Sequence, residues 1–132
     1  MEVRIKSPTY QAIAEDLIAS EECLLPIQQS DVIITCLASD AEKRKNRKVV
    51  FAECEKVPDK YKWAVPCDFT ITVFEPNCER LTDEQMRIVM LHELMHVGIE
   101  MDGNEARFFT RPHDVEDFKA IIERFGMEWS NG

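Results

Sequence analysis

Hydrophobic residues recur at helical spacing near the start of the chain and at alternate positions in its middle. Ser7 followed by Pro8 is typical of a helix start, and apolar residues at positions 13, 14, 17 and 18 predict a helix over about residues 8–20. The segments 31–38 (DVIITCLA) and 48–54 (KVVFAEC) are rich in β-branched and apolar residues, so we expect two strands that pair as a hairpin. Residues 68–74 (DFTITVF) alternate between two faces and predict a third strand.

The second half of the chain reads mainly as helix. Thr82 and Gln85 form a capping-box pattern before the apolar run MRIVMLHELM, which predicts a long helix over about residues 83–100 that stops near Gly103. We expect the segment NEARFFTRP (104–112) to be a short connection. A final helix, acidic at its start, should follow over residues 114–126.

These elements predict a single α+β domain over residues 1–132. Its small, mostly antiparallel sheet has about three strands, together with an N-terminal helix, a long second helix and a C-terminal helix. No apolar run approaches the ~18 residues that span a bilayer, and the first residues lack the pattern of a signal peptide. We therefore expect a cytoplasmic protein without a membrane partner.

The five cysteines favour packing roles over disulfides or metal binding. Their number is odd, their spacings are wide and no C-x-x-C pair occurs. Three of them, at positions 36, 54 and 67, lie in or beside apolar, strand-like runs. We expect reduced thiols that act as small hydrophobic side chains.

The net charge of −9 argues against a dedicated nucleic-acid-binding protein, because phosphate neutralisation needs a basic face. The exception is local: five of the six residues from Lys43 to Lys48 are basic. Between two strand-like runs, such a segment is most simply a solvated hairpin loop that discourages edge-to-edge aggregation. A contact with an anion, a nucleic acid or an acidic partner is the alternative.

His92, Glu93 and His96 form an H-E-x-x-H motif inside the predicted second helix. Residues four apart lie on one helical face about 6 Å apart, so two imidazoles can converge on one tetrahedral zinc ion. Glu93 is rotated by about 100° from His92, which suits a general base that addresses a water without being a ligand. The surrounding residues are apolar, and burial of such polar groups is costly unless a metal and hydrogen bonds satisfy them.

A catalytic zinc site usually has three protein ligands and an open position for water. His113 is the leading candidate for the third ligand, because sixteen residues separate it from His96, enough for the chain to turn near Gly103 and return. Glu105 would give a glutamate-type ligand instead. Glu100 continues the i+4 series but cannot readily bend back to the metal, and Asp114 is a further alternative.

The runs MLHELMHVGIEMDG and RPHDVEDFKAIIERFGMEW resemble the phage-type metallopeptidases, small zincin-like proteins of phages and prophages. The resemblance covers about residues 49–129 and includes an H-D-V-E-x-F element that begins at His113. It implies a minimal zincin fold in which His92, His96 and His113 hold Zn²⁺ and Glu93 is catalytic, in the cytoplasm of a bacterial host. A more distant similarity is to the SprT-like zinc proteases. The metzincin extension G-x-x-H is absent from the sequence.

We therefore expect a zinc-dependent peptidase that hydrolyses a peptide or protein substrate, with Glu93 as general base. The alternatives are a zinc hydrolase of another amide and a non-catalytic zinc module that binds a partner through the basic loop. A residue that stabilises the tetrahedral intermediate could come from Tyr10, Tyr61, Arg107 or Arg111. The strand at residues 68–74 is the expected site for a substrate bound as an added strand.

Overall fold

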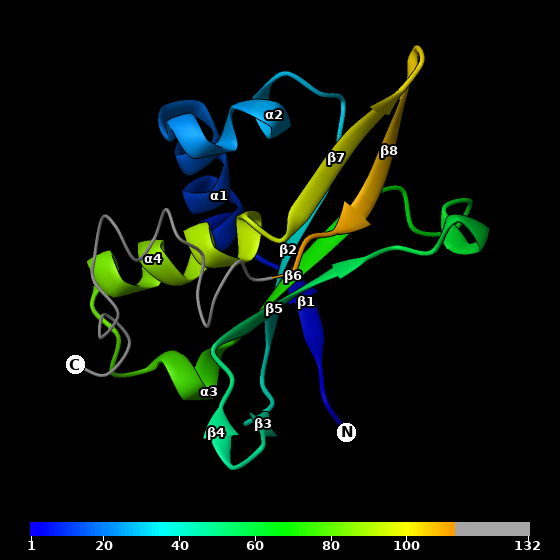
Figure 1. Ribbon diagram of the computed structural model, residues 1–132. Helices are drawn as coiled ribbons and strands as arrows, with labels where there is room; N and C mark the ends of the chain where they lie inside the picture. Colours follow the sequence, from blue (N-terminus) through cyan, green and yellow to red (C-terminus); the bar gives the residue numbers. More distant parts are fainter. Residues whose placement is uncertain (113–132) are drawn as a thin grey trace.

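The computed structural model describes residues 1–112 and consists of small sheets with helices on one side (Figure 1). It is an α+β protein, as the sequence predicts. No helix in this part of the chain has the length and apolar character needed to cross a membrane. The predicted final helix over residues 114–126 lies outside the described residues. The elements, in chain order, are β1 Arg4–Lys6, α1 Pro8–Ser20, η1 Glu22–Leu24, α2 Leu25–Gln28, β2 Ile34–Ser39, β3 Arg44–Lys45, β4 Lys48–Val49, β5 Ala52–Lys56, η2 Asp59–Tyr61, β6 Phe69–Phe74, α3 Glu75–Cys78, α4 Asp83–Leu94, β7 Val97–Asp102 and β8 Glu105–Thr110.

The main sheet has four strands in the order β1-β2-β6-β5. Strand β6 lies between β2, to which it is parallel, and β5, to which it is antiparallel. The prediction that residues 31–38 and 48–54 pair as a hairpin is therefore wrong. The reason is that β6 is the most apolar of the three strands and takes the central place between the other two, where both of its faces and both of its edges are covered.

The basic segment forms a hairpin of its own. It consists of β3 and β4, which pair through Arg44–Val49 and Lys45–Lys48 and form a separate two-stranded sheet. The predicted strand at residues 48–54 is thus divided: its first two residues belong to β4, and β5 begins at Ala52.

Helices α1 and α4 cover one face of the main sheet (Figure 1). The side chains of Phe69, Ile71 and Val73, which alternate along β6, are fully buried against this layer. Ser7 accepts a hydrogen bond from the Tyr10 N–H (3.2 Å) and so caps α1 as predicted. The opposite face of β6 is covered by charged side chains, among them Arg4, which donates to Thr72 (3.2 Å) and lies over the Phe74 ring.

The predicted long helix over residues 83–100 is wrong over its last six residues. Helix α4 ends at Leu94, and the chain continues into β7, which pairs with β8 as an antiparallel hairpin. Gly103 is not a helix stop but the first residue of the two-residue hairpin turn, with φ of +66°, and the segment predicted as a short connection is β8. Val97 and Ile99 are β-branched and flank Gly98, a combination that favours a strand once a partner strand follows.

A candidate metal centre at the end of helix α4

The start of α4 is fixed by a complete capping box. Thr82 Oγ1 accepts a hydrogen bond from the Gln85 N–H (3.1 Å), and Gln85 Oε1 accepts one from the Thr82 N–H (2.9 Å). The helix then buries its apolar residues against the sheet, with Met90 and Leu94 fully inaccessible to solvent. This packing sets the rotation of the helix about its axis and therefore the direction of the side chains in its last turn.

His92 and Glu93 lie in that last turn, whereas His96 lies just beyond it. The His96 N–H bonds to the Glu93 carbonyl (3.0 Å), a tighter i to i−3 turn that follows the last helical bond, from Met95 to Leu91. The expected regular helix through the motif is thus not observed. The two imidazoles nevertheless converge, with ring centroids 5.2 Å apart.

Together the three residues form a compact cluster, which we call the His-Glu-His cluster. One ligand atom from each of His92, Glu93 and His96 lies within 4.8 Å of the others. Glu93 is buried, with 7% of its surface exposed, and its Oε2 lies 4.0 Å from His92 Nε2. Two neutral imidazoles and a carboxylate are a donor set that suits zinc and related divalent transition metals.

The tautomer of His96 follows from its hydrogen bond. Its Nδ1 lies 2.7 Å from the Arg111 carbonyl oxygen, which can only accept, so Nδ1 carries the proton and donates. Nε2 is then the ring nitrogen that has the lone pair with which a histidine binds a metal ion. In metal sites, a histidine that binds the metal through one ring nitrogen usually donates a hydrogen bond from the other, often to a backbone carbonyl, and this bond fixes its tautomer and orientation.

The β7–β8 hairpin brings Arg111 to this position. Val97 pairs with Thr110, and the next pair along the ladder is completed by the Arg111 N–H, which donates to the His96 carbonyl (2.6 Å). Because the His96 backbone N–H is used by the turn at Glu93, the imidazole takes its place and bonds to the Arg111 carbonyl. The chain therefore returns to the cluster at residue 111.

A cleft of about 340 Å³ opens beside the cluster. Its walls come from the end of α4, strand β5 and the basic hairpin. Among the residues that line it are Ala52, Glu53 and Cys54 of β5 and Lys43 and Lys45 of the hairpin. Burial, and secondarily the nearby charge of Glu93, raises the pKa of the Cys54 thiol, so this residue is a neutral wall of the cleft at physiological pH.

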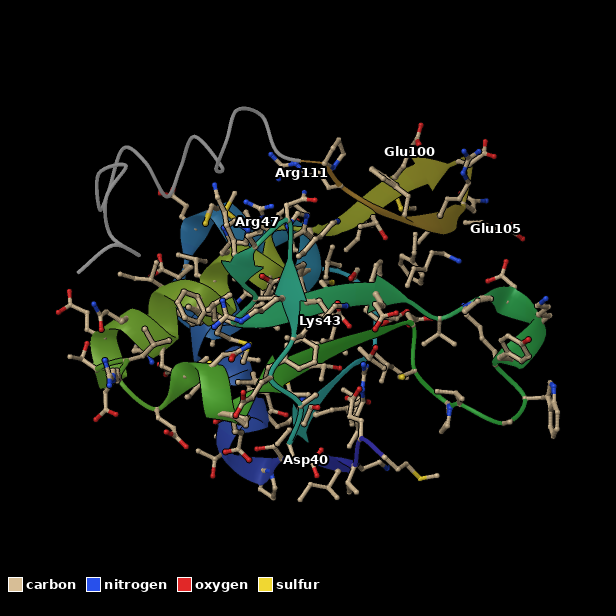
Figure 2. The ribbon with its side chains drawn as sticks, turned by 90° about the horizontal axis from the view of Figure 1, so that it is seen from below. Asp40, Lys43, Arg47, Glu100, Glu105 and Arg111 are labelled. Carbon is tan, nitrogen blue, oxygen red and sulfur yellow. The ribbon has the colours of Figure 1, made fainter. Side chains whose placement is uncertain are left out.

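Two rivals for the third ligand are excluded from the cluster. Within residues 1–112, the group of potential ligands contains neither Glu100 nor Glu105. Glu105 pairs with Asp102 at the far end of the β7–β8 hairpin, as Figure 2 shows by the positions of Glu105 and Arg111. His113 and Asp114 lie outside the described residues.

None of the four expected stabilising residues lines the cleft as a side chain. Tyr10 donates to Glu75 (3.0 Å) in a different cavity, Tyr61 is half exposed in η2, and Arg107 pairs opposite Glu100. Arg111 contacts His96 through its backbone. The cations that do line the cleft are Lys43 and Lys45. The sequence predicts only a solvated or partner-binding loop for them, and their place next to strand β5 connects them with the site.

A model of the family described as "Putative phage metallopeptidase" matches residues 3–132 of this chain. The match includes the His-Glu-His cluster and the whole of the described fold. No curated protein and no solved structure matches the chain.

Proposed function

The chain belongs to this family of phage metallopeptidases, and on that premise we propose that it is a zinc-dependent peptidase with Glu93 as general base. The observation that carries the proposal is the His-Glu-His cluster, in which His96 donates from Nδ1 to the Arg111 carbonyl, so that Nε2 is the nitrogen with the lone pair for a metal ion. A buried carboxylate beside two imidazoles is the arrangement that hydrolytic zinc sites use.

We propose His92 and His96 as two of the metal ligands and His113 as the third. Support for His113 comes from the β7–β8 hairpin, which returns the chain to the cluster at Arg111, two residues earlier in the sequence. Two residues span at most about 7 Å of extended chain, so the position of Arg111 keeps residue 113 within reach of the cluster.

Zinc held by these ligands would supply a Lewis acid and lower the pKa of a bound water towards neutrality. The protein's part in the reaction belongs to Glu93. Its carboxylate accepts a proton from the attacking water and then delivers that proton to the nitrogen of the leaving amine, so that one water is consumed for each peptide bond. Burial at the end of α4 holds the carboxylate in one position for both transfers.

The place expected for an extended substrate has to be revised. The strand at residues 68–74 is β6, which has paired neighbours on both sides and offers no edge. Strand β5 is one of the two edge strands of the main sheet, and its residues Ala52 and Cys54 line the cleft. We propose that a peptide substrate pairs along β5, because this strand lies at an edge of the sheet and contributes residues to the cleft beside the cluster.

The experiment that tests the proposal compares the wild type with Glu93→Gln. Zinc per chain is counted by elemental analysis, and both proteins are assayed against a mixed peptide library. We expect full zinc in both proteins, cleavage by the wild type, and a rate at least about 10²-fold lower in the variant, because the proton acceptor is lost. Glu93→Gln is nearly isosteric, so the cluster keeps its shape.

The other outcomes separate the alternatives. Full zinc without cleavage by either protein would point to a non-catalytic zinc module or to hydrolysis of a non-peptide amide. Equal cleavage by both proteins would remove Glu93 from the mechanism. Absence of zinc from the wild type would overturn the proposal as a whole.

A further inference from the structure

The basic hairpin, defined as residues Lys43 to Val50, has a fixed conformation. Asn46 and Arg47 have φ of 53° and 66°, and Lys45 pairs with Lys48 on either side of them. Two consecutive positive φ angles in a two-residue loop are the signature of a type I′ turn, whose twist matches that of the flanking strands. The five basic side chains are thus carried by a defined turn.

The base of the hairpin is clamped to the main fold. The Asn77 side-chain amide in α3 donates to the carbonyl of Lys43 (2.9 Å) and to the carbonyl of Val50 (2.8 Å), one at each end of the hairpin. The Val50 N–H also bonds to the Lys43 carbonyl (3.1 Å). Because α3 follows directly on β6, this clamp sets the hairpin at one place relative to the sheet and the cleft. Figure 2 shows it in front of the sheet, with Lys43 and Arg47 labelled.

The two lysines that line the cleft differ in whether their charge is already paired within the protein. Lys43 forms an ion pair with Glu53, which also lies 3.5 Å from Arg4, so that the carboxylate of Glu53 is matched by two cations. Lys45 lines the cleft, is exposed, and takes part in no ion pair within residues 1–112. Its ammonium group is therefore the positive charge that a molecule in the cleft meets.

The basic hairpin carries five positive charges between Lys43 and Lys48, opposite in sign to the whole chain, which carries −9. A strongly acidic protein repels acidic peptides everywhere except where a basic surface attracts them. The cleft next to the cluster has this basic hairpin in its wall, through Lys43 and Lys45. A neutral or basic peptide gains nothing from it.

We propose that the basic hairpin selects acidic peptides, with Lys45 contacting an aspartate or glutamate side chain close to the scissile bond. This inference rests on the proposed function, because it identifies the substrate class of the same site. A fixed hairpin and a cation at the wall of the cleft restrict the contact to a few substrate positions. The nearby edge strand β5 holds the substrate backbone in the same cleft.

The test measures binding apart from turnover. Two fluorescent peptides of equal length and sequence are used, one with glutamates and one with glutamines at the same positions. Zinc-loaded Glu93→Gln protein is titrated with each at low and moderate salt. We expect the glutamate peptide to bind about three- to tenfold more tightly, and the difference to shrink as salt rises, because the contact is a partly exposed ion pair.

Lys45→Glu, made in the same background, should abolish or reverse the preference. Lys60→Glu is the matched control, since it makes the same change in net charge at an exposed lysine of η2 outside the cleft. A preference unchanged in Lys45→Glu, or lost equally in Lys60→Glu, would overturn the proposal. So would tighter binding of a DNA or RNA oligonucleotide than of the glutamate peptide.

A parallel cleavage assay with the wild type keeps the two proposals distinguishable. Cleavage without any preference for acidic residues would leave the peptidase standing and remove the role of the hairpin. Absence of cleavage, with a glutamate preference that depends on Lys45, would remove the peptidase and retain the hairpin as an acidic-peptide site.

Discussion

The two histidines of the motif are held in position by different parts of the structure. His92 is placed by the packing of α4, whereas His96 depends on a backbone carbonyl fifteen residues away, at Arg111. A residue held by a distant carbonyl is sensitive to everything that positions that carbonyl.

The third ligand can be tested at the level of single residues. His113→Ala should lower zinc affinity by at least about 100-fold, because it removes one of three ligands, whereas Glu105→Ala should leave it within about twofold. Competition with a chromophoric chelator measures both. Comparable zinc affinity in wild type and His113→Ala would contradict the assignment and redirect the search to other residues.

The thiols give a second prediction at this scale. Burial raises the pKa of Cys36 to about 12 and that of Cys78 to about 11, with a smaller contribution from a nearby glutamate in each case. A raised pKa leaves little thiolate, so these groups should stay unreactive in the folded protein between pH 7 and 9. Cys23 is exposed. We expect a disulfide-exchange reagent to titrate one thiol quickly in the native protein and five after denaturation; two or more fast thiols would contradict this.

At the residue scale the sequence predicted the cluster well, since three residues with a metal-binding spacing need only a local turn to meet. It did not predict the place of Lys45. The basic residues were visible in the sequence, but their position at the cleft depends on Asn77, more than thirty residues away, and on the division of one expected strand into β4 and β5.

At the scale of elements, the β7–β8 hairpin is the main departure from the sequence-based expectation. The Gly103-Asn104 pair lies between two runs of strand length, which is a known signal for a two-residue hairpin loop. Apolar residues at 97 and 99 also fit the helical period of α4, and this period predicts a longer helix. The hydrophobic period does not distinguish a longer helix from a strand here, because the apolar residues of a strand that directly follows a helix can match the helical spacing by chance.

Gly98 is the residue on which the packing of this hairpin depends. A Cβ atom there would lie 2.5 Å from Cε2 of Phe109, its partner across the ladder. Gly98→Ala should therefore displace the ring or the strand, lower the free energy of unfolding by about 1–3 kcal/mol, and weaken zinc binding by about tenfold through His96. Denaturant unfolding and chelator competition measure the two effects.

The control is the double variant Gly98→Ala with Phe109→Ala. The three atoms that lie nearest to the added methyl group all belong to the Phe109 ring, so Gly98→Ala should cost much less in the Phe109→Ala background than in the wild type. An equal cost in both backgrounds would place the effect in the glycine backbone and not in the contact with Phe109.

On the scale of the whole molecule, the site lies where four parts of the fold meet: the end of α4, the edge strand β5, the basic hairpin and the β7–β8 hairpin. The parallel pairing of β2 with β6 makes this arrangement possible, because it leaves β5 at the edge of the sheet beside the cluster. Such a crossover joins segments thirty-five residues apart, and strand patterns in a sequence contain no signal for it.

This arrangement predicts that metal binding stabilises the entire fold. His92 belongs to α4 and His96 to the start of the β7–β8 hairpin, so a metal ion would link two elements that unfolding must separate. A ligand at 100 times its dissociation constant stabilises the folded state by about 2.7 kcal/mol, which for a domain of this size raises Tm by roughly 10 °C. Thermal unfolding with excess zinc and with chelator should show this shift in the wild type and in Glu93→Gln, but not in His92→Ala. Because the comparison is the zinc-dependent shift within each variant, a lower starting Tm in His92→Ala does not affect it; an equal shift in His92→Ala would place the metal elsewhere.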